Sequence, residues 1–174
     1  ELYNLRVGYG TLTEEERFKI NQHIVQTEVM LRQLPFPPHL THVPEIAAGH
    51  HEKMDGTGYP KGLHHEQLRP ETRMLAIADI FEALTASDRP YKKPKKLSEA
   101  IEILNRMSQR GHIDPALFAL FLSSGVYRVY AERFLDPSQI DDVPVTTYLA
   151  ATDGTRLAQR ADPAVARTLA SSSA

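Results

Sequence analysis

Residues 70–85 read PETRMLAIADIFEALT, and this stretch decides the fold class. A proline suits the first turn of an α-helix, so a helix is expected to begin at Pro70. Apolar side chains then recur at the 3.6-residue helical period, and Arg89 and Pro90 are expected to end the helix. The stretch therefore predicts a long amphipathic helix with an apolar row of Met74, Ile77, Ala78, Phe81 and Leu84.

The same helical pattern recurs on both sides of this stretch. Thr13 and Glu16 form a capping box that opens a helix, whose apolar row runs from Ile20 to Leu34 before Pro35 ends it. No run alternates with the two-residue period of a β-strand, so the sequence predicts an all-α fold, a helical bundle. The other expected helices are a short one that begins near Pro44 and carries His50 and His51, one capped by Ser98 and closed by Gly111, one over residues 117–122 capped by Asp114, and one over residues 126–134.

Composition restricts the function classes. A chain of 174 residues, 41% of them hydrophobic, can bury the core of one domain. Its net charge of −2 argues against a nucleic-acid polymer or an anionic membrane as partner. Cysteine is absent, so any metal must be held by histidines and carboxylates. No apolar run suggests a membrane span or a cleavable signal, which predicts a cytoplasmic location.

The chain is expected to divide near residue 140. Residues 1–140 carry the helical patterns and form the predicted domain. Residues 141–174 are rich in Ala, Thr, Ser and charge, and they predict a peripheral or partly disordered tail. Because the chain begins at Glu1 and not at Met, it is expected to be a piece of a longer protein.

Metal-ligating residue types gather on three of the predicted helices. His23 lies beside the apolar row of the first helix, His50 and His51 are adjacent on the short helix, and Asp79 interrupts an apolar run. A buried carboxylate is costly unless it is paired or bound to a cation. Adjacent residues on a helix point about 100° apart, so the two histidines could serve two metals, or one metal and one substrate oxygen. Taken singly, each of these residues is more often structural or solvated.

Residues 50–60, HHEKMDGTGYP, supply a long and specific motif. They closely resemble the HHE, DG and GYP signature of the HD-GYP family. Residues 77–85, IADIFEALT, and residues 88–92, DRPYK, are also similar to that family. The similarity extends from about Thr11 to Phe134, and a chance match to three ordered motifs is implausible.

The resemblance implies an HD-superfamily helical bundle over residues 1–140. It also implies a di- or trinuclear metal centre, of iron or manganese, that hydrolyses cyclic di-GMP to linear pGpG, GMP or both in bacterial signalling. A diguanylate cyclase-type (GGDEF) domain, an upstream sensory or regulatory domain and a second copy of the chain are the implied partners. The implied metal ligands are His23, His50, His51 and Asp79.

The resemblance also assigns residues to the substrate. Arg89 and Lys92 are implied to contact its phosphates, and a guanidinium can grip phosphate through two hydrogen bonds. Gly58 and Pro60 belong to the loop that borders the active site in the family. Tyr59 offers a ring or a hydroxyl to a guanine, and a purely structural role is the alternative.

The sequence departs from the family at the His-Asp doublet that names it. The doublet would lie upstream of Leu12, and no histidine here is followed directly by aspartate. Two readings remain: the doublet lies outside these residues, which the intact motifs favour, or the protein is a degenerate module that binds a nucleotide or a partner. A mixed guanine–adenine cyclic dinucleotide is an alternative substrate. A zinc protease motif, H-E-x-x-H, fails because Asp55 stands at its last position.

Overall fold

The computed structural model describes residues 14–86 and 94–151, and this part of the chain contains helices and no β-strand. The all-α fold predicted from the sequence is confirmed. Its α-helices are α1 (Glu14–Arg32), α2 (Val43–Gly49), α3 (Pro70–Thr85), α4 (Leu97–Gln109), α5 (Pro115–Ser123), α6 (Val126–Phe134) and α7 (Val145–Ala151), with short 3₁₀ turns at Pro38–Leu40, His65–Gln67 and Pro137–Gln139.

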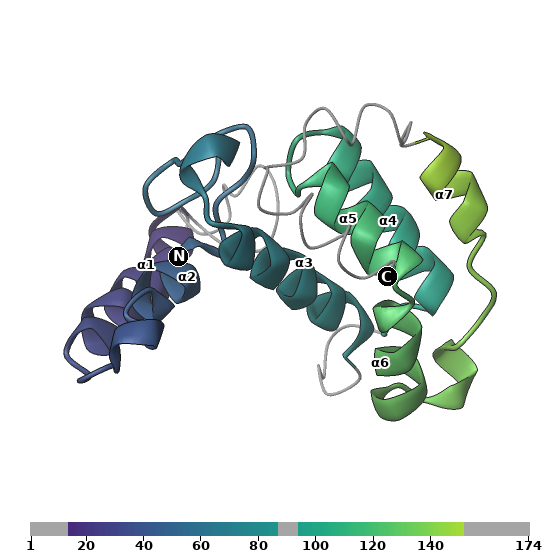
Figure 1. The fold of residues 1–174 in the computed structure, drawn as a ribbon, viewed down its shortest axis with the longest axis horizontal. Coiled ribbons are helices and arrows are strands. Elements are labelled where there is room, and N and C mark those ends of the chain that lie inside the picture. The colour runs from purple at the N-terminus through teal and green to yellow at the C-terminus, as the bar shows by residue number, and fades with distance from the viewer. Residues whose placement is uncertain (1–13, 87–93, 152–174) are drawn as a thin grey trace, which may run out of the picture.

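Helix α3 connects the two ends of the molecule (Figure 1). Helix α2 packs against its N-terminal half and α1 packs against α2, whereas α4 and α5 pack against its other side. The main hydrophobic core lies between α3, α4, α5 and α6. Its largest fully buried side chains include Leu97, Ile101, Leu104, Ile113 and Phe118.

Local sequence signals mark the ends of three helices. The Asp114 side chain accepts hydrogen bonds from the backbone N–H groups of Ala116 and Leu117, and so caps α5. Gly111 follows α4 with φ of +71°, a left-handed conformation that favours glycine. Helix α6 covers residues 126–134, as predicted.

Other helix predictions were wrong in detail. Ser98 does not cap α4: Lys96 stands at that position, and Ser98 donates hydrogen bonds from its N–H and its hydroxyl to the carboxylate of Asp141. Leu34, the last residue of the row assigned to α1, follows the helix end and is 51% exposed. Helix α3 ends at Thr85, before the predicted stop, and Met74 and Ala78 of its predicted apolar row are exposed.

The segment that follows residue 140 contains an element that the sequence did not predict. Val145, Tyr148 and Leu149 of α7 pack against the main core, and α7 contacts α5. Residues 152–174 lie outside the described residues, so the division of the chain at residue 140 stays a prediction.

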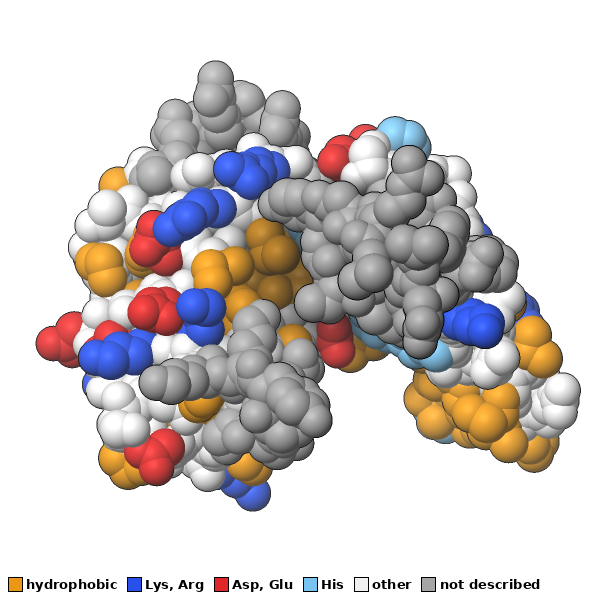
Figure 2. All heavy atoms as spheres, turned by 180° about the vertical axis from the view of Figure 1, so that it is seen from behind, with side chains coloured by type: hydrophobic (Ala, Val, Ile, Leu, Met, Phe, Trp, Pro, Cys, Tyr) orange, Lys and Arg blue, Asp and Glu red, His pale blue; other side chains and the backbone are white. Residues whose placement is uncertain are grey.

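Large apolar side chains are exposed at the end of the molecule formed by α1 and the turn that follows it (Figure 2). They are Val25, Val29, Met30, Leu34 and Leu40. Within the described residues, no helix combines the length and apolar character that crossing a membrane requires.

Candidate metal centre

The two adjacent histidines lie just beyond α2. His50 is the C-terminal cap residue of the helix, and His51 follows in a turn closed by a 2.9 Å hydrogen bond from Glu52 N to Gly49 O. The prediction that both lie on the helix was therefore wrong. A Cβ on Gly49 would lie 2.6 Å from Cγ2 of Thr72, so glycine lets the end of α2 approach α3 closely.

His50, His51 and Asp79 converge at this junction. Asp79 lies in the middle of α3, and one ligand atom from each residue lies within 4.8 Å of the others. The three come from two segments about 30 positions apart in the chain, so only the packing of α2 on α3 brings them together. Imidazole nitrogen with carboxylate oxygen is a donor set that suits iron, manganese or zinc.

The backbone of α2 fixes the tautomer of His50. Its Nδ1 lies 2.7 Å from the carbonyl oxygen of Ala47. A carbonyl oxygen can only accept, so Nδ1 carries a proton and donates it, and in the neutral ring Nε2 is then the nitrogen with the lone pair. Metal-ligating histidines commonly use their second nitrogen in this way. His50 therefore presents Nε2 to a cation.

His51 lies at the centre of a cluster of rings. Its ring centroid is 4.2 Å from that of His50, 5.5 Å from that of His23, and 4.9 Å from that of Tyr59, which stacks on it at 23°. Burial lowers the pKa of His51 below its ordinary value of 6.5, and the charge of His50 acts in the same direction, whereas Asp79 opposes it. The neutral imidazole, which is the metal-binding form, is therefore favoured.

His23 lies close to this cluster, on the exposed side of α1, next to the buried Ile24. Its ring meets that of His51 edge to face. The three-residue group with mutually close ligand atoms does not include His23. The structure thus brings His23 to the edge of the site, and its assignment as a ligand stays a prediction.

The predicted substrate loop borders the site. The ring of Tyr59 covers one face of His51, and burial raises the pKa of the Tyr59 hydroxyl, with the Asp79 carboxylate acting in the same direction. Pro60 follows through a cis peptide bond and is half-buried. A Cβ on Gly58 would lie 2.4 Å from both Cα of Glu52 and N of Lys53, so only glycine fits between them.

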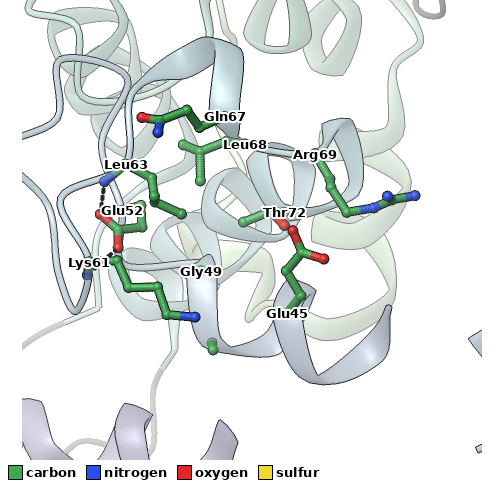
Figure 3. Close-up of a pocket in the computed structure, with 10 residues that line it drawn as sticks. Glu45, Gly49, Glu52, Lys61, Leu63, Gln67, Leu68, Arg69 and Thr72 are labelled. Carbon is green, nitrogen blue, oxygen red and sulfur yellow. Dashed lines mark hydrogen bonds between the residues drawn. The ribbon is translucent and has the colours of Figure 1, made fainter. Parts of the chain in front are cut away.

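Sequence reasoning missed the role of Glu52. Its side chain is buried, and its two oxygens accept hydrogen bonds from Lys61 N, at 2.6 Å, and Leu63 N, at 2.9 Å. Figure 3 shows these bonds at the wall of a pocket that Glu52 lines together with Lys61 and Leu63. None of the three converging ligand residues lines that pocket, so it is separate from the candidate metal centre. The sequence does hold a signal for these hydrogen bonds: Glu52 is an acidic residue that directly precedes a glycine-rich loop.

A second buried polar cluster supports the other end of the same loop. Arg73 of α3 donates to the carboxylate of Asp114, and the ring of His65 lies within hydrogen-bond distance of both. Backbone bonds from Met54 N to His112 O and from Asp55 N to Gly111 O attach the loop to the α4–α5 turn. The loop is therefore held at several points along its length.

Arg89 and Lys92, the predicted phosphate contacts, lie outside the described residues. One side chain connects the two described segments that flank them. The buried side chain of Gln139 donates to the carbonyl oxygens of Thr85 and Lys95, which lie on opposite sides of residues 87–93.

Comparison with known proteins identifies the family. The model of the HD domain family matches residues 1–117. The chain belongs to the HD domain family. Membership of this family implies a divalent metal centre, and the convergence of His50, His51 and Asp79 fits such a centre. The predicted resemblance to the HD superfamily is thereby confirmed.

Curated relatives of this HD domain are named phosphodiesterases. A cyclic di-GMP phosphodiesterase of Pseudomonas aeruginosa is 46% identical over 91 residues, 51% of this chain and 21% of the relative. A 3′3′-cGAMP-specific phosphodiesterase of Vibrio cholerae is 38% identical over 111 residues, 63% of this chain and 23% of the relative. A cyclic di-GMP phosphodiesterase of Thermotoga maritima is 41% identical over 101 residues, 57% of this chain and 26% of the relative. The chain thus matches about a quarter of each relative's length.

Proposed function

We propose that the protein is a metal-dependent phosphodiesterase that hydrolyses cyclic di-GMP to linear pGpG, GMP or both. The convergence of His50, His51 and Asp79 is the observation that carries the proposal, because it supplies ligands for a divalent cation. The names of the relatives support the choice of a cyclic dinucleotide as substrate.

The proposed cofactor is a di- or trinuclear centre of iron or manganese, with His23, His50, His51 and Asp79 among its ligands. When bound, close cations would neutralise phosphate charge and stabilise the leaving oxygen. The protein prepares its ligands in the absence of the metal. The Ala47 carbonyl orients the ring of His50, and burial lowers the pKa of His51, which favours its neutral, metal-binding form.

The substrate contacts of this proposal come from two segments. Tyr59, held over His51, offers an aromatic face beside the reacting phosphate, next to Gly58 and Pro60 of its loop. Arg89 and Lys92 are proposed to bind phosphate oxygens, which suits a guanidinium and an ammonium group. A guanine base can stack on a ring such as that of Tyr59 while the phosphates face the cations.

A substrate panel tests the proposal. The full-length protein, purified anaerobically, is assayed with cyclic di-GMP and 3′3′-cGAMP in the presence of Fe²⁺ or Mn²⁺. The proposal predicts faster hydrolysis of cyclic di-GMP. Faster hydrolysis of 3′3′-cGAMP would favour the second candidate, which the name of the Vibrio cholerae relative supports. A folded, metal-loaded protein that hydrolyses neither would contradict both and favour the degenerate binding module.

A cytoplasmic location belongs to the same proposal, because cyclic dinucleotides act as intracellular messengers. A GGDEF-type domain, an upstream sensory or regulatory domain and a second copy of the chain stay predictions based on the resemblance to HD-GYP proteins.

A further inference from the structure

Glu52 is a buried carboxylate at the edge of the candidate metal centre. It directly follows His51, and only 2% of the residue is exposed. Burying a carboxylate is costly unless hydrogen bonds replace the water it loses. The N–H groups of Lys61 and Leu63 supply that replacement, one to each oxygen. Hydrogen bonds to an ionised acceptor are the stronger kind.

These bonds direct Glu52 away from the ligand cluster. Its side chain lines the pocket of Figure 3, which contains none of His50, His51 and Asp79. The acidic residue of the sequence His-Glu is therefore not available as a ligand or as a general base at this centre. Its two oxygens serve the backbone of the loop instead.

The same bonds determine where Tyr59 lies. The two hydrogen bonds hold residues 61–63 next to the Glu52 carboxylate. Gly58, which lies between Glu52 and these residues in the sequence, packs directly against the Glu52 backbone. Tyr59 N then donates to His51 O at 3.3 Å, and the Tyr59 ring stacks on the imidazole of His51. The chain of contacts runs from the Glu52 carboxylate through the loop backbone to the ring of a candidate ligand.

Lys61 extends this arrangement to α1. Its side-chain Nζ donates to Glu28 at 2.8 Å, while its backbone N–H donates to Glu52. Glu28 lies on the helix that carries His23, five residues further along. The loop thus holds α1 as well as Tyr59 in relation to the centre.

We infer that Glu52 is a positioning residue for the metal centre: by holding the loop of residues 58–63, it keeps Tyr59 stacked on His51 and fixes the direction of that imidazole. The inference rests on the proposed function only in taking His51 as a ligand. Groups that orient ligands contribute about 10- to 100-fold to metal affinity. Loss of the Glu52 hydrogen bonds should weaken metal binding by a factor in that range.

The test uses Glu52→Gln in the full-length protein, with Glu45→Gln as the matched control. Glu45 lines the same pocket, but its side chain is half exposed, and its Oε2 lies 3.6 Å from Nδ1 of His42. A glutamine at position 52 keeps one acceptor and presents an amide donor to the second N–H. Mn²⁺ affinity is measured by calorimetry. The ring-to-ring NOE between Tyr59 and His51 is measured by NMR without metal.

The inference predicts that Glu52→Gln folds, loses the NOE and binds Mn²⁺ about 10- to 100-fold more weakly, whereas Glu45→Gln matches the wild type. An intact NOE with unchanged Mn²⁺ affinity would overturn it. If the wild type binds no Mn²⁺, the proposed function fails, and the metal-free NOE still decides the role of Glu52.

A second variant covers the case in which Glu52→Gln does not fold. Tyr59→Leu leaves the Glu52 hydrogen bonds in place and removes the ring that lies on His51. It is expected to keep its thermal stability near that of the wild type and to bind Mn²⁺ about 10-fold more weakly. Wild-type Mn²⁺ affinity in Tyr59→Leu would overturn the inference, because the loop would then have no effect on the ligand.

Discussion

Replacement of Gly58 by alanine tests how tightly the substrate loop is held. The added Cβ would lie 2.4 Å from Cα of Glu52 and 2.4 Å from N of Lys53, and ordinary contact begins at 3.4 Å. Both neighbours are backbone atoms, so neither can turn aside as a side chain would. The loop must therefore retreat by about 1 Å, the difference between the two distances.

This displacement of the loop determines how much stability Gly58→Ala loses. It would lengthen the bonds from Lys61 N and Leu63 N to Glu52 from 2.6 and 2.9 Å to about 3.6 and 3.9 Å, beyond the usual limit of about 3.2 Å. A hydrogen bond to a charged group contributes about 1.5–3 kcal/mol. Partial relaxation of the loop recovers some of this, so Gly58→Ala should lower the free energy of unfolding by about 3 kcal/mol.

Urea denaturation of the metal-free full-length protein, followed by circular dichroism, measures this free energy. Gly125→Ala is the control, because Gly125 has φ of +71° but nothing within 4 Å of its added Cβ. Gly125→Ala should lower the free energy of unfolding by about 1 kcal/mol, because the only cost is the strain of an alanine in a left-handed conformation. A loss of stability in Gly58→Ala no larger than that in Gly125→Ala would show that the loop is not held tightly against Glu52.

Two further predictions concern the polar contacts that support the site. Asp114→Ala removes the cap of α5, worth about 1 kcal/mol, and leaves the buried Arg73 without that carboxylate, which costs about 3–5 kcal/mol. Asp114→Asn keeps the capping oxygen and should be the less destabilised by about 1 kcal/mol in urea denaturation; equal stabilities of the two variants would argue against the cap. The pKa of Glu28 is held below its ordinary value of 4.5, chiefly by the hydrogen bond from Lys61 and then by that from Arg32. Its stabilising effect is therefore present above about pH 4.5 and is lost as the pH falls through the lowered folded-state pKa. Glu28→Gln should be less stable than the wild type at neutral pH and approach it in acid, in thermal melts recorded across pH; a difference that does not change with pH would contradict this.

The sequence predicted those parts of the fold whose causes are local. The cap at Asp114 acts two and three residues ahead, and Gly111 ends α4 through its own backbone conformation. Helix α6 has the predicted bounds, because apolar residues at helical spacing and Gly125 mark it without help from the rest of the chain. Helix α7 has a comparable row in Val145, Tyr148 and Leu149, which the small and polar composition around it obscured.

The parts that could not be predicted depend on contacts between distant residues. Helix α2 ends before the histidines where Gly49 packs against Thr72, a contact that periodicity does not reveal. Glu52 bonds to groups nine and eleven residues ahead, and Asp114 pairs with a residue 41 positions away. The motif indicated which residues gather at the centre, whereas their geometry required the packing of α2 on α3.

The metal content and the activity of Asp79→Ala test the central claim most directly. The full-length wild type, Asp79→Ala and the control Glu71→Ala are purified anaerobically, and Glu71 is an exposed residue in the first turn of the same helix. Elemental analysis and cyclic di-GMP hydrolysis are measured on the same samples. We expect metal and hydrolysis in the wild type and in Glu71→Ala, and the loss of both in Asp79→Ala. Hydrolysis by an Asp79→Ala protein that has lost its metal would contradict this expectation.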